Sequence, residues 1–295
     1  MSSFEIFQKI VLGTAQFGLN YGIANTAGQV SLAETSSIVN LAWQRGLNTL
    51  DTAIAYGESE KVLGEIAVSN WQIMSKLPAV PDTVPDVAVW VDTQVADSLQ
   101  RLKVNRLHAL LLHRPSQLFE SRGIELYRAL TMQQERGKVE KIGISIYDPS
   151  ELNQLTSLMR FDLVQAPFNL FDARMSDSGW MQRLEQMGCE LHVRSVFLQG
   201  LLLMSPDLRP VQFDPWKPLW TIWDAWLQDS GLTPLQACLR YALSTPGIAK
   251  VVLGVETTTQ LEEILKASQG ECPPIPNALK ISDPELLNPA LWRTT

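Results

Sequence analysis

The chain has 295 residues, of which 45% are hydrophobic and 19% are charged, and its formal net charge is −7. This composition is typical of a globular protein and excludes a disordered chain. Because the chain is acidic and has no cluster of lysine and arginine, we do not expect it to bind nucleic acid through the phosphate backbone.

No segment of the sequence reads as a membrane anchor or a signal peptide. Apolar runs stay well below the roughly 18 residues of a membrane-spanning helix. The first residues, MSSFEIFQKIVLG, lack a basic region and a small-residue cleavage site. The three cysteines are far apart and form no C-x-x-C pair, so neither a disulfide framework nor a metal site is expected. We therefore expect a cytoplasmic protein that does not associate with membranes.

Short apolar runs alternate with longer amphipathic segments along the chain. Several of the short runs are almost continuously apolar, which is typical of parallel strands buried on both faces. The predicted strands are 10–13, 47–50, 71–75, 107–112, 139–144, 162–165, 190–197 and 248–253. Helical patterns cover 33–45, 59–68, 86–102, 122–136, 175–187, 233–244 and 257–267. Ser31 and Thr257 are expected to cap helices, and Pro234 suits a first helical position.

The alternation of strand and helix predicts parallel β-strands joined by helices. About eight such units within 295 residues favour a closed (β/α)8 TIM barrel that forms a single domain over residues 1–295. A doubly wound sheet is the alternative, but the first strand is followed by GTAQFG rather than the dinucleotide-binding G-x-G-x-x-G.

A long segment after the seventh strand, SPDLRPVQFDPWKP, leads into a helix rich in tryptophan. Long insertions on a barrel usually serve function. Trp216, Trp220, Trp223 and Trp226 share one face of that helix. They either pack in the core or against a second subunit, or they form an aromatic wall over the substrate.

Reactive side chains follow the predicted strands, where barrels of this kind carry their active sites. Asp51 and Tyr56 follow the second strand, Lys76 the third and His113 the fourth. Each has a structural explanation when taken singly: Asp51 could cap a turn, Tyr56 could be a half-buried loop tyrosine, Lys76 could be solvated and His113 could be a structural histidine.

Together the four side chains predict a site that polarises a carbonyl oxygen. A tyrosine is a poor proton donor at neutral pH unless its pKa is lowered, and a nearby lysine cation lowers it. Asp51 can hold Lys76 in place, and His113 can orient the oxygen. We expect Tyr56→Phe to abolish turnover. We expect Lys76→Met to do so with little loss of stability, because a strand-end lysine facing the mouth packs little apolar area.

These residues resemble the aldo-keto reductase family. The stretch from Asp51 to Gly64, DTAIAYGESEKVLG, is similar to the N-terminal signature of that family, and Lys76 and His113 match the rest of its catalytic tetrad. Further matches lie within 137–145, 165–169 and 253–263, so the resemblance covers roughly residues 10–267. It implies a (β/α)8 barrel that binds NADPH across its mouth and reduces aldehydes or ketones.

The resemblance also implies which residues hold the cofactor. Ser145 and Gln165 would hold the nicotinamide carboxamide. Arg194 stands where many relatives stack a tyrosine on the nicotinamide, and Ile146 replaces a hydrogen-bonding asparagine. The remaining predicted cofactor residues are Ser195, Phe197, Gln199 and Gly200 after the seventh strand, and Gly254, Val255, Glu256, Thr257, Gln260 and Glu263 after the eighth.

The segment expected to bind the adenosine end departs from the basic pattern of the family. GVETTTQLEEIL offers a 2′-phosphate the N–H groups of a helix N-terminus and two hydroxyls, but no cation nearer than Lys266. Glu256 would repel the phosphate if it pointed inward. We expect both cofactors to bind, with NADPH tighter than NADH by about ten-fold, or about 1.4 kcal/mol.

The sequence thus predicts an NAD(P)H-dependent carbonyl reductase that acts on a small carbonyl compound, as a monomer or weak oligomer. Two alternatives stay open. One is a cofactor-binding regulatory barrel with little turnover, because Ile146 and Arg194 depart from the family pattern. The other is a barrel isomerase or lyase that uses no nicotinamide.

Overall fold

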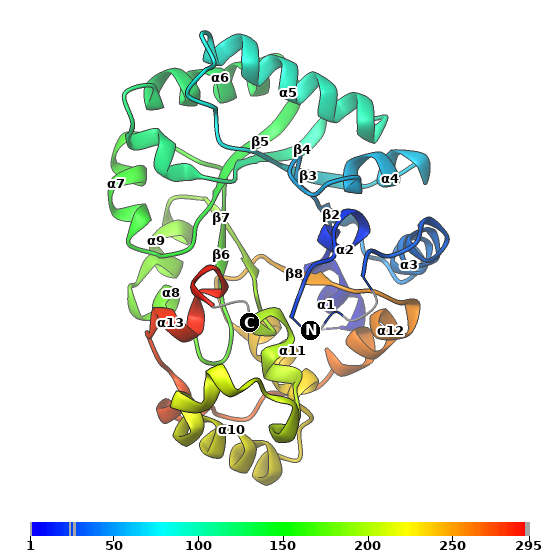
Figure 1. The fold of residues 1–295 in the computed structure, drawn as a ribbon, viewed down its shortest axis with the longest axis vertical. Coiled ribbons are helices and arrows are strands. Elements are labelled where there is room, and N and C mark those ends of the chain that lie inside the picture. Colours follow the sequence, from blue (N-terminus) through cyan, green and yellow to red (C-terminus); the bar gives the residue numbers. More distant parts are fainter. Residues whose placement is uncertain (1, 24, 26–27, 293–295) are drawn as a thin grey trace.

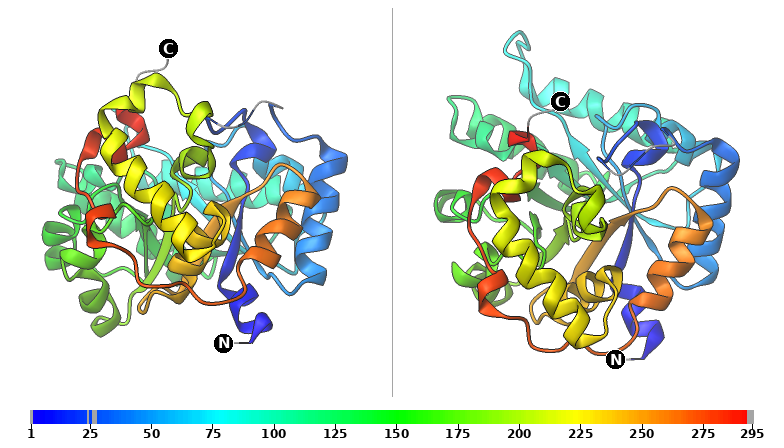
Figure 2. Two further views of the ribbon diagram at one scale, coloured as in Figure 1. Left: turned by 90° about the horizontal axis from the view of Figure 1, so that it is seen from below. Right: turned by 60° about the horizontal axis from the view of Figure 1, so that its bottom comes forward.

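A computed structural model describes residues 2–23, 25 and 28–292, and its centre is a closed barrel of parallel strands. The strands pair in chain order, and β8 pairs with β1 to close the barrel. Figures 1 and 2 show helices packed around the outside of these strands. The predicted (β/α)8 barrel is therefore confirmed. The strands are β1 (Ile10–Gly13), β2 (Thr49–Asp51), β3 (Gln72–Leu77), β4 (Leu107–Leu112), β5 (Val139–Ser145), β6 (Leu163–Pro167), β7 (Glu190–Arg194) and β8 (Lys250–Gly254).

Most predicted helices are found close to their expected bounds, with the expected caps. Ser31 and Thr257 each accept a hydrogen bond from a backbone N–H of the helix that follows, and Pro234 is the first residue of α11. The helices are α1 (Ser3–Lys9), α2 (Ala15–Gly18), α3 (Leu32–Gln44), α4 (Ser59–Glu65), α5 (Val87–Leu102), α6 (Gly123–Glu135), α7 (Glu151–Leu158), α8 (Arg174–Asp177), α9 (Trp180–Gln186), α10 (Lys217–Ser230), α11 (Pro234–Ser244), α12 (Thr258–Ala267) and α13 (Pro284–Leu287). Short 3₁₀ turns cover Pro115–Phe119, Leu198–Leu203, Pro206–Leu208, Val211–Trp216, Asn277–Leu279 and Pro289–Leu291.

Two predicted boundaries are wrong for reasons of backbone conformation. The helix expected over 175–187 is two helices, α8 and α9, because Gly179 has a φ of 73°. The strand expected over 190–197 ends at Arg194, because Ser195 has a φ of 61° and turns the chain away from the sheet.

The interior of the barrel is filled by a cluster of apolar side chains. Further along the same strands, the inward-facing side chains at the mouth are polar. Val11, Met74, Ala109, Leu111 and Leu163 form this cluster, apart from the main core that packs between strands and helices. Successive side chains of a strand point to opposite faces. Lys76, His113 and Gln165 each lie two residues beyond a member of this cluster, so their side chains also point into the barrel.

The tryptophan-rich helix α10 packs into the core. Trp220, Trp223 and Trp226 are buried, and the rings of Trp220 and Trp223 lie 5.3 and 5.7 Å from the ring of Phe171 in the loop after β6. Of the alternatives for this stripe, core packing is the one that the structure supports. The long segment before α10 forms 3₁₀ turns that lead into the helix.

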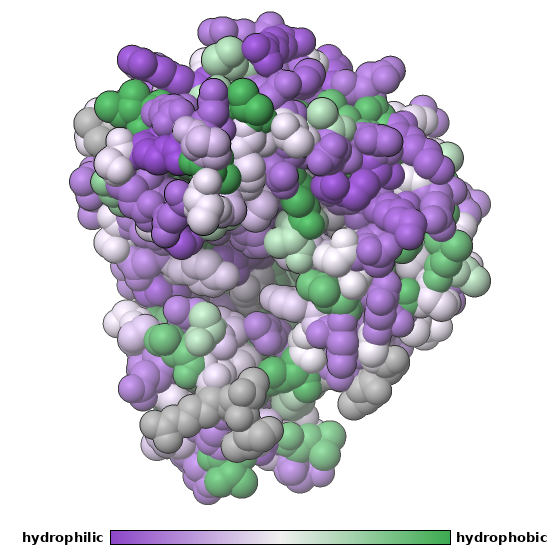
Figure 3. Space-filling model, turned by 45° about the horizontal axis from the view of Figure 1, so that its top comes forward, coloured by the Kyte–Doolittle hydropathy of each residue, from purple (hydrophilic) through white to green (hydrophobic). Residues whose placement is uncertain are grey.

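The surface and the cysteines show little that departs from an ordinary globular chain. On the face drawn in Figure 3, hydrophobic residues are scattered among hydrophilic ones. All three cysteines are free.

Among the residues described, no helix has both the length and the apolar character needed to cross a membrane.

Candidate active site

The four predicted catalytic side chains lie together at the C-terminal end of the barrel. The Lys76 Nζ atom lies 2.5 Å from Oδ2 of Asp51 and 3.5 Å from the hydroxyl of Tyr56. The ring of Tyr56 meets that of His113 edge to face, with 5.9 Å between their centroids. Four residues from three neighbouring strand ends therefore form one cluster.

Lys76 is a buried cation rather than a solvated one. Only 1% of its side chain is exposed, and its Nζ also donates to the carbonyl oxygen of Thr52. Burial alone would lower the pKa of Lys76, but the negative charge of Asp51 and the hydroxyl of Tyr56 outweigh burial, so the pKa is raised. Lys76 is thus held in its charged form, and the alternative that it is solvated is wrong. Because it is buried against Asp51, we now expect its replacement to lower stability.

Ser145 and Gln165 are buried behind this cluster. The Nε2 atom of Gln165 donates to Oδ1 of Asp51 at 2.8 Å, and its Oε1 accepts from Ser145 at 3.4 Å. One oxygen of the Asp51 carboxylate accepts a hydrogen bond from Gln165 and the other accepts one from Lys76. These two contacts fix the orientation of the carboxylate. The expected contact of Ser145 and Gln165 with a carboxamide remains a prediction.

The loop that carries Tyr56 is fixed by close backbone packing. The N–H of Ser59 donates to the carbonyl of Tyr56, and the hydroxyl of Ser59 donates to Thr14 at the end of β1. A Cβ atom at Gly18 would overlap the carbonyl oxygen of Tyr56. Gly57 has a φ of 54°, a conformation that favours glycine. The signature glycine therefore allows the turn that presents Tyr56.

The rest of the signature joins α4 to its neighbours. Glu60 is 1% exposed and accepts hydrogen bonds from Ser75 on β3, and from Ser98 and Arg101 on α5. A Cβ atom at Gly64 would overlap the carbonyl oxygen of Arg101. These two signature residues are structural: they set how closely α4 and α5 pack beside the mouth.

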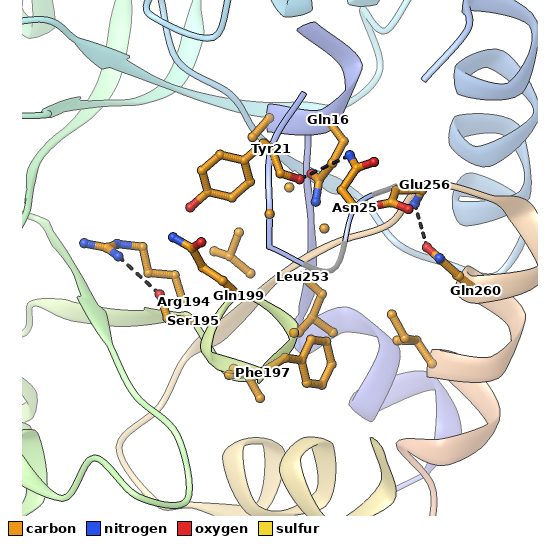
Figure 4. A pocket seen from close by; sticks show the side chains of 18 of the residues that line it. Gln16, Tyr21, Asn25, Arg194, Ser195, Phe197, Gln199, Leu253, Glu256 and Gln260 are labelled. Carbon is orange, nitrogen blue, oxygen red and sulfur yellow. Dashed lines mark hydrogen bonds between the residues drawn. The ribbon is translucent and has the colours of Figure 1, made fainter. Parts of the chain in front are cut away.

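A cavity of about 390 Å³ extends from Tyr56 and Asp51 to the start of α12. This volume is in the range of small-molecule sites. Figure 4 shows Tyr21 and Arg194 at one end, with Glu256 and Gln260 across the cavity from them. Nine predicted cofactor residues line it: Arg194, Ser195, Phe197, Gln199, Gly200, Gly254, Glu256, Gln260 and Glu263. Four do not: Ser145 and Gln165 lie behind the tetrad, Val255 is buried and Thr257 caps α12.

Several lining residues were not predicted from the sequence. Gln16, Tyr21 and Asn25 follow β1, and Leu235 belongs to α11. The first three follow a strand end, the same signal that identified the tetrad. Leu235 carries no such signal, because an apolar residue in a helix is expected in the core.

Arg194 is held firmly at the tetrad end of the cavity. Its Nη2 donates to the carbonyl oxygen of Ile146 at 3.0 Å, and its guanidinium lies 4.6 Å from the centre of the Tyr147 ring. Burial, followed by the positive charges of Lys76 and Arg194, lowers the pKa of His113 to about 4. His113 is therefore neutral at physiological pH.

The backbone on the β7 side of the cavity is unusual. Ser195, Leu198 and Gln199 all have positive φ, at 61°, 48° and 53°. Such conformations are costly for residues other than glycine and cluster at ligand sites. On the neighbouring strand β8, a Cβ atom at Gly254 would lie 2.7 Å from the side-chain amide of Gln16. The glycine therefore makes room for the Gln16 side chain in this part of the wall. The positive φ angles after β7 are of the kind found where a ligand lies against the backbone.

The chain matches a known family along most of its length. The model of the Aldo/keto reductase family matches residues 9–273. The "Uncharacterized oxidoreductase YqkF" of Bacillus subtilis (strain 168) is 23% identical over 273 residues, which are 85% of this chain and 84% of that protein.

Solved structures of the same family share the fold. The aldo-keto reductase AKR11C1 from Bacillus halodurans, in its holo form, aligns with a TM-score of 0.70 at 18% identity over 90% of this chain and 87% of that one. A putative aldo-keto reductase from Pseudomonas aeruginosa aligns with a TM-score of 0.65 at 22% identity over 88% and 89%. With the family match, the chain belongs to the aldo/keto reductase family of oxidoreductases.

Proposed function

We propose that this protein is a carbonyl reductase that reduces an aldehyde or ketone to the alcohol with a reduced nicotinamide cofactor. The observation that carries the proposal is the hydroxyl of Tyr56, which lies 3.5 Å from a buried lysine cation and on the wall of the cavity. A proton donor beside a fixed positive charge is what a carbonyl oxygen needs when it becomes an alkoxide.

Each residue of the tetrad has a separate task in this proposal. Tyr56 donates the proton to the oxygen. Lys76 stabilises the negative charge left on the phenol, and Asp51 holds Lys76 in position and in its charged form. His113 is neutral, so it can donate an N–H hydrogen bond to the substrate oxygen without adding a second charge.

The remaining walls would hold the cofactor. The loop from Ser195 to Gly200 and the glycine at Gly254 leave backbone exposed along the cavity, as a long ligand requires. The cofactor, when bound, supplies the hydride. Arg194 and Tyr21 would enclose the reacting end and keep water from it. NADPH is the form implied by the family resemblance, and NADH is the alternative.

A turnover assay with a panel of aldehydes and ketones tests the proposal. Consumption of either reduced cofactor that depends on the carbonyl compound supports it. Cofactor binding without turnover on any carbonyl would indicate a regulatory barrel instead. Failure to bind either cofactor, measured by calorimetry, would contradict the proposal and favour an isomerase or lyase.

A further inference from the structure

The far end of the cavity, away from the tetrad, is acidic. Glu256 and Glu263 line it together with Gln260. Of the residues described along the cavity wall, Arg194 is the one lysine or arginine, and it belongs to the tetrad end. A phosphate group that entered the far end would therefore meet two carboxylates, with no lysine or arginine among the described lining residues of that end to balance their charge.

Two N–H groups in the first turn of α12 already have partners from the chain itself. The N–H of Thr258 donates to Oε1 of Glu34 at 2.7 Å, and the N–H of Gln260 donates to the hydroxyl of Thr257 at 3.1 Å. Just before the helix, the N–H of Glu256 donates to Oε1 of Gln260 at 2.8 Å. These three are among the N–H groups on which the expected binding of a 2′-phosphate depended.

Glu34 also changes the electrostatics of this helix end. The start of a helix carries partial positive charge that a carboxylate compensates. Glu34, on α3, places its carboxylate directly on that end, so little of the attraction for a phosphate remains. A phosphate would have to displace Glu34 and then lie among three carboxylates. A ribose with free hydroxyls has hydrogens to donate, and carboxylates are strong acceptors for them.

We propose that the acidic far end selects the cofactor without a 2′-phosphate, so that NADH binds more tightly than NADPH, and that Glu256 is the residue that discriminates. The inference rests on the proposed function, because it takes the cavity to hold a nicotinamide dinucleotide. It reverses the ten-fold preference for NADPH that the family resemblance implies.

The test is the dissociation constant of each of NADH, NADPH, NAD⁺ and NADP⁺, measured by calorimetry on the whole chain. NADH should bind at least ten-fold more tightly than NADPH, and NAD⁺ more tightly than NADP⁺. Glu256→Gln should narrow the ratio of the NADPH dissociation constant to the NADH dissociation constant several-fold, and Glu256→Arg should invert this ratio. Added salt should narrow the ratio in the unmutated chain, because salt screens repulsion between charges.

Glu262→Gln is the matched control. Glu262 lies on the same helix but is exposed and pairs with Arg45, so its loss should leave the ratio unchanged. NADPH binding more tightly in the unmutated chain, or a ratio unmoved by both Glu256 variants, would overturn the inference while leaving the carbonyl reductase intact. Failure of all four cofactors to bind would overturn the proposed function and this inference with it.

Discussion

The hydroxyl of Tyr56 is the single atom on which the proposed chemistry depends. Tyr56→Phe removes it and leaves the ring against His113, so the cavity should keep its shape. We expect turnover to fall by about 10²- to 10⁴-fold, because a positioned proton donor contributes that much. Cofactor affinity should change by no more than a few-fold. Steady-state rates with calorimetric binding measure both, and a variant that keeps most of its turnover would remove Tyr56 from the mechanism.

Lys76 combines a chemical role with a structural one. Lys76→Met leaves the carboxylate of Asp51 buried without its cation, which costs about 3–5 kcal/mol in the free energy of unfolding. Turnover should be lost as well. The double variant Lys76→Met with Asp51→Asn removes both charges, so it should regain most of the stability but not the turnover. Urea unfolding provides the comparison, and a stable Lys76→Met protein would show that the pair is not as buried as we describe.

The tetrad could be predicted from the sequence because each member follows a strand and matches a signature. The burial of Lys76 could not, because it depends on Asp51, Thr52 and Tyr56, which come from β2 and its loop and surround the Lys76 Nζ atom. The occupied N-terminus of α12 depends on Glu34, which lies 224 residues before its partner in the chain. Contacts between elements so far apart leave no local pattern in the sequence.

At the scale of secondary-structure elements, Glu60 is the residue that joins α4 to β3 and α5. Glu60→Gln keeps the shape but removes the negative charge that Arg101 and two serine hydroxyls contact. We expect the free energy of unfolding to fall by about 2–3 kcal/mol, as for buried hydrogen bonds to a charged group. The matched control is Glu65→Gln, on the same helix but exposed, which should change stability by less than about 0.5 kcal/mol. Equal effects of the two variants in urea unfolding would contradict this role.

Strand positions could be predicted well because buried parallel strands are short apolar runs. Helix ends were less predictable where a single residue decides them. Gly179 divides α8 from α9, and Ser195 ends β7 early, both through positive φ. Serine is not typical of a positive φ, so the turn at Ser195, which shapes the cavity wall, could not be predicted from the sequence.

At the scale of the whole molecule, all three histidines make stability depend on pH in the same direction. The pKa of His113 is lowered from 6.5 to about 4, chiefly by burial, and those of His108 and His192 are lowered as well. As the pH falls below 6.5, the histidines of the unfolded chain therefore bind protons that the same histidines of the folded chain do not bind. The free energy of unfolding should fall as the pH falls from 6.5 toward 4.

His113→Asn removes one of these contributions. Denaturant unfolding at a series of pH values should show a shallower decline for the variant than for the unmutated chain over that interval. Identical slopes would mean that His113 titrates alike in the folded and unfolded states, contrary to its burial beside two cations.

The most direct test of the central claim is the transfer of deuterium. Reduced cofactor, as NADH and as NADPH, carries deuterium in place of both hydrogens at C4 of the nicotinamide, it is incubated with an accepted aldehyde, and the alcohol is analysed by mass spectrometry. We expect one deuterium on the carbinol carbon with the unmutated chain, and a rate reduced by about 10²-fold or more with Tyr56→Phe. An alcohol without deuterium, or equal rates from the two proteins, would contradict it.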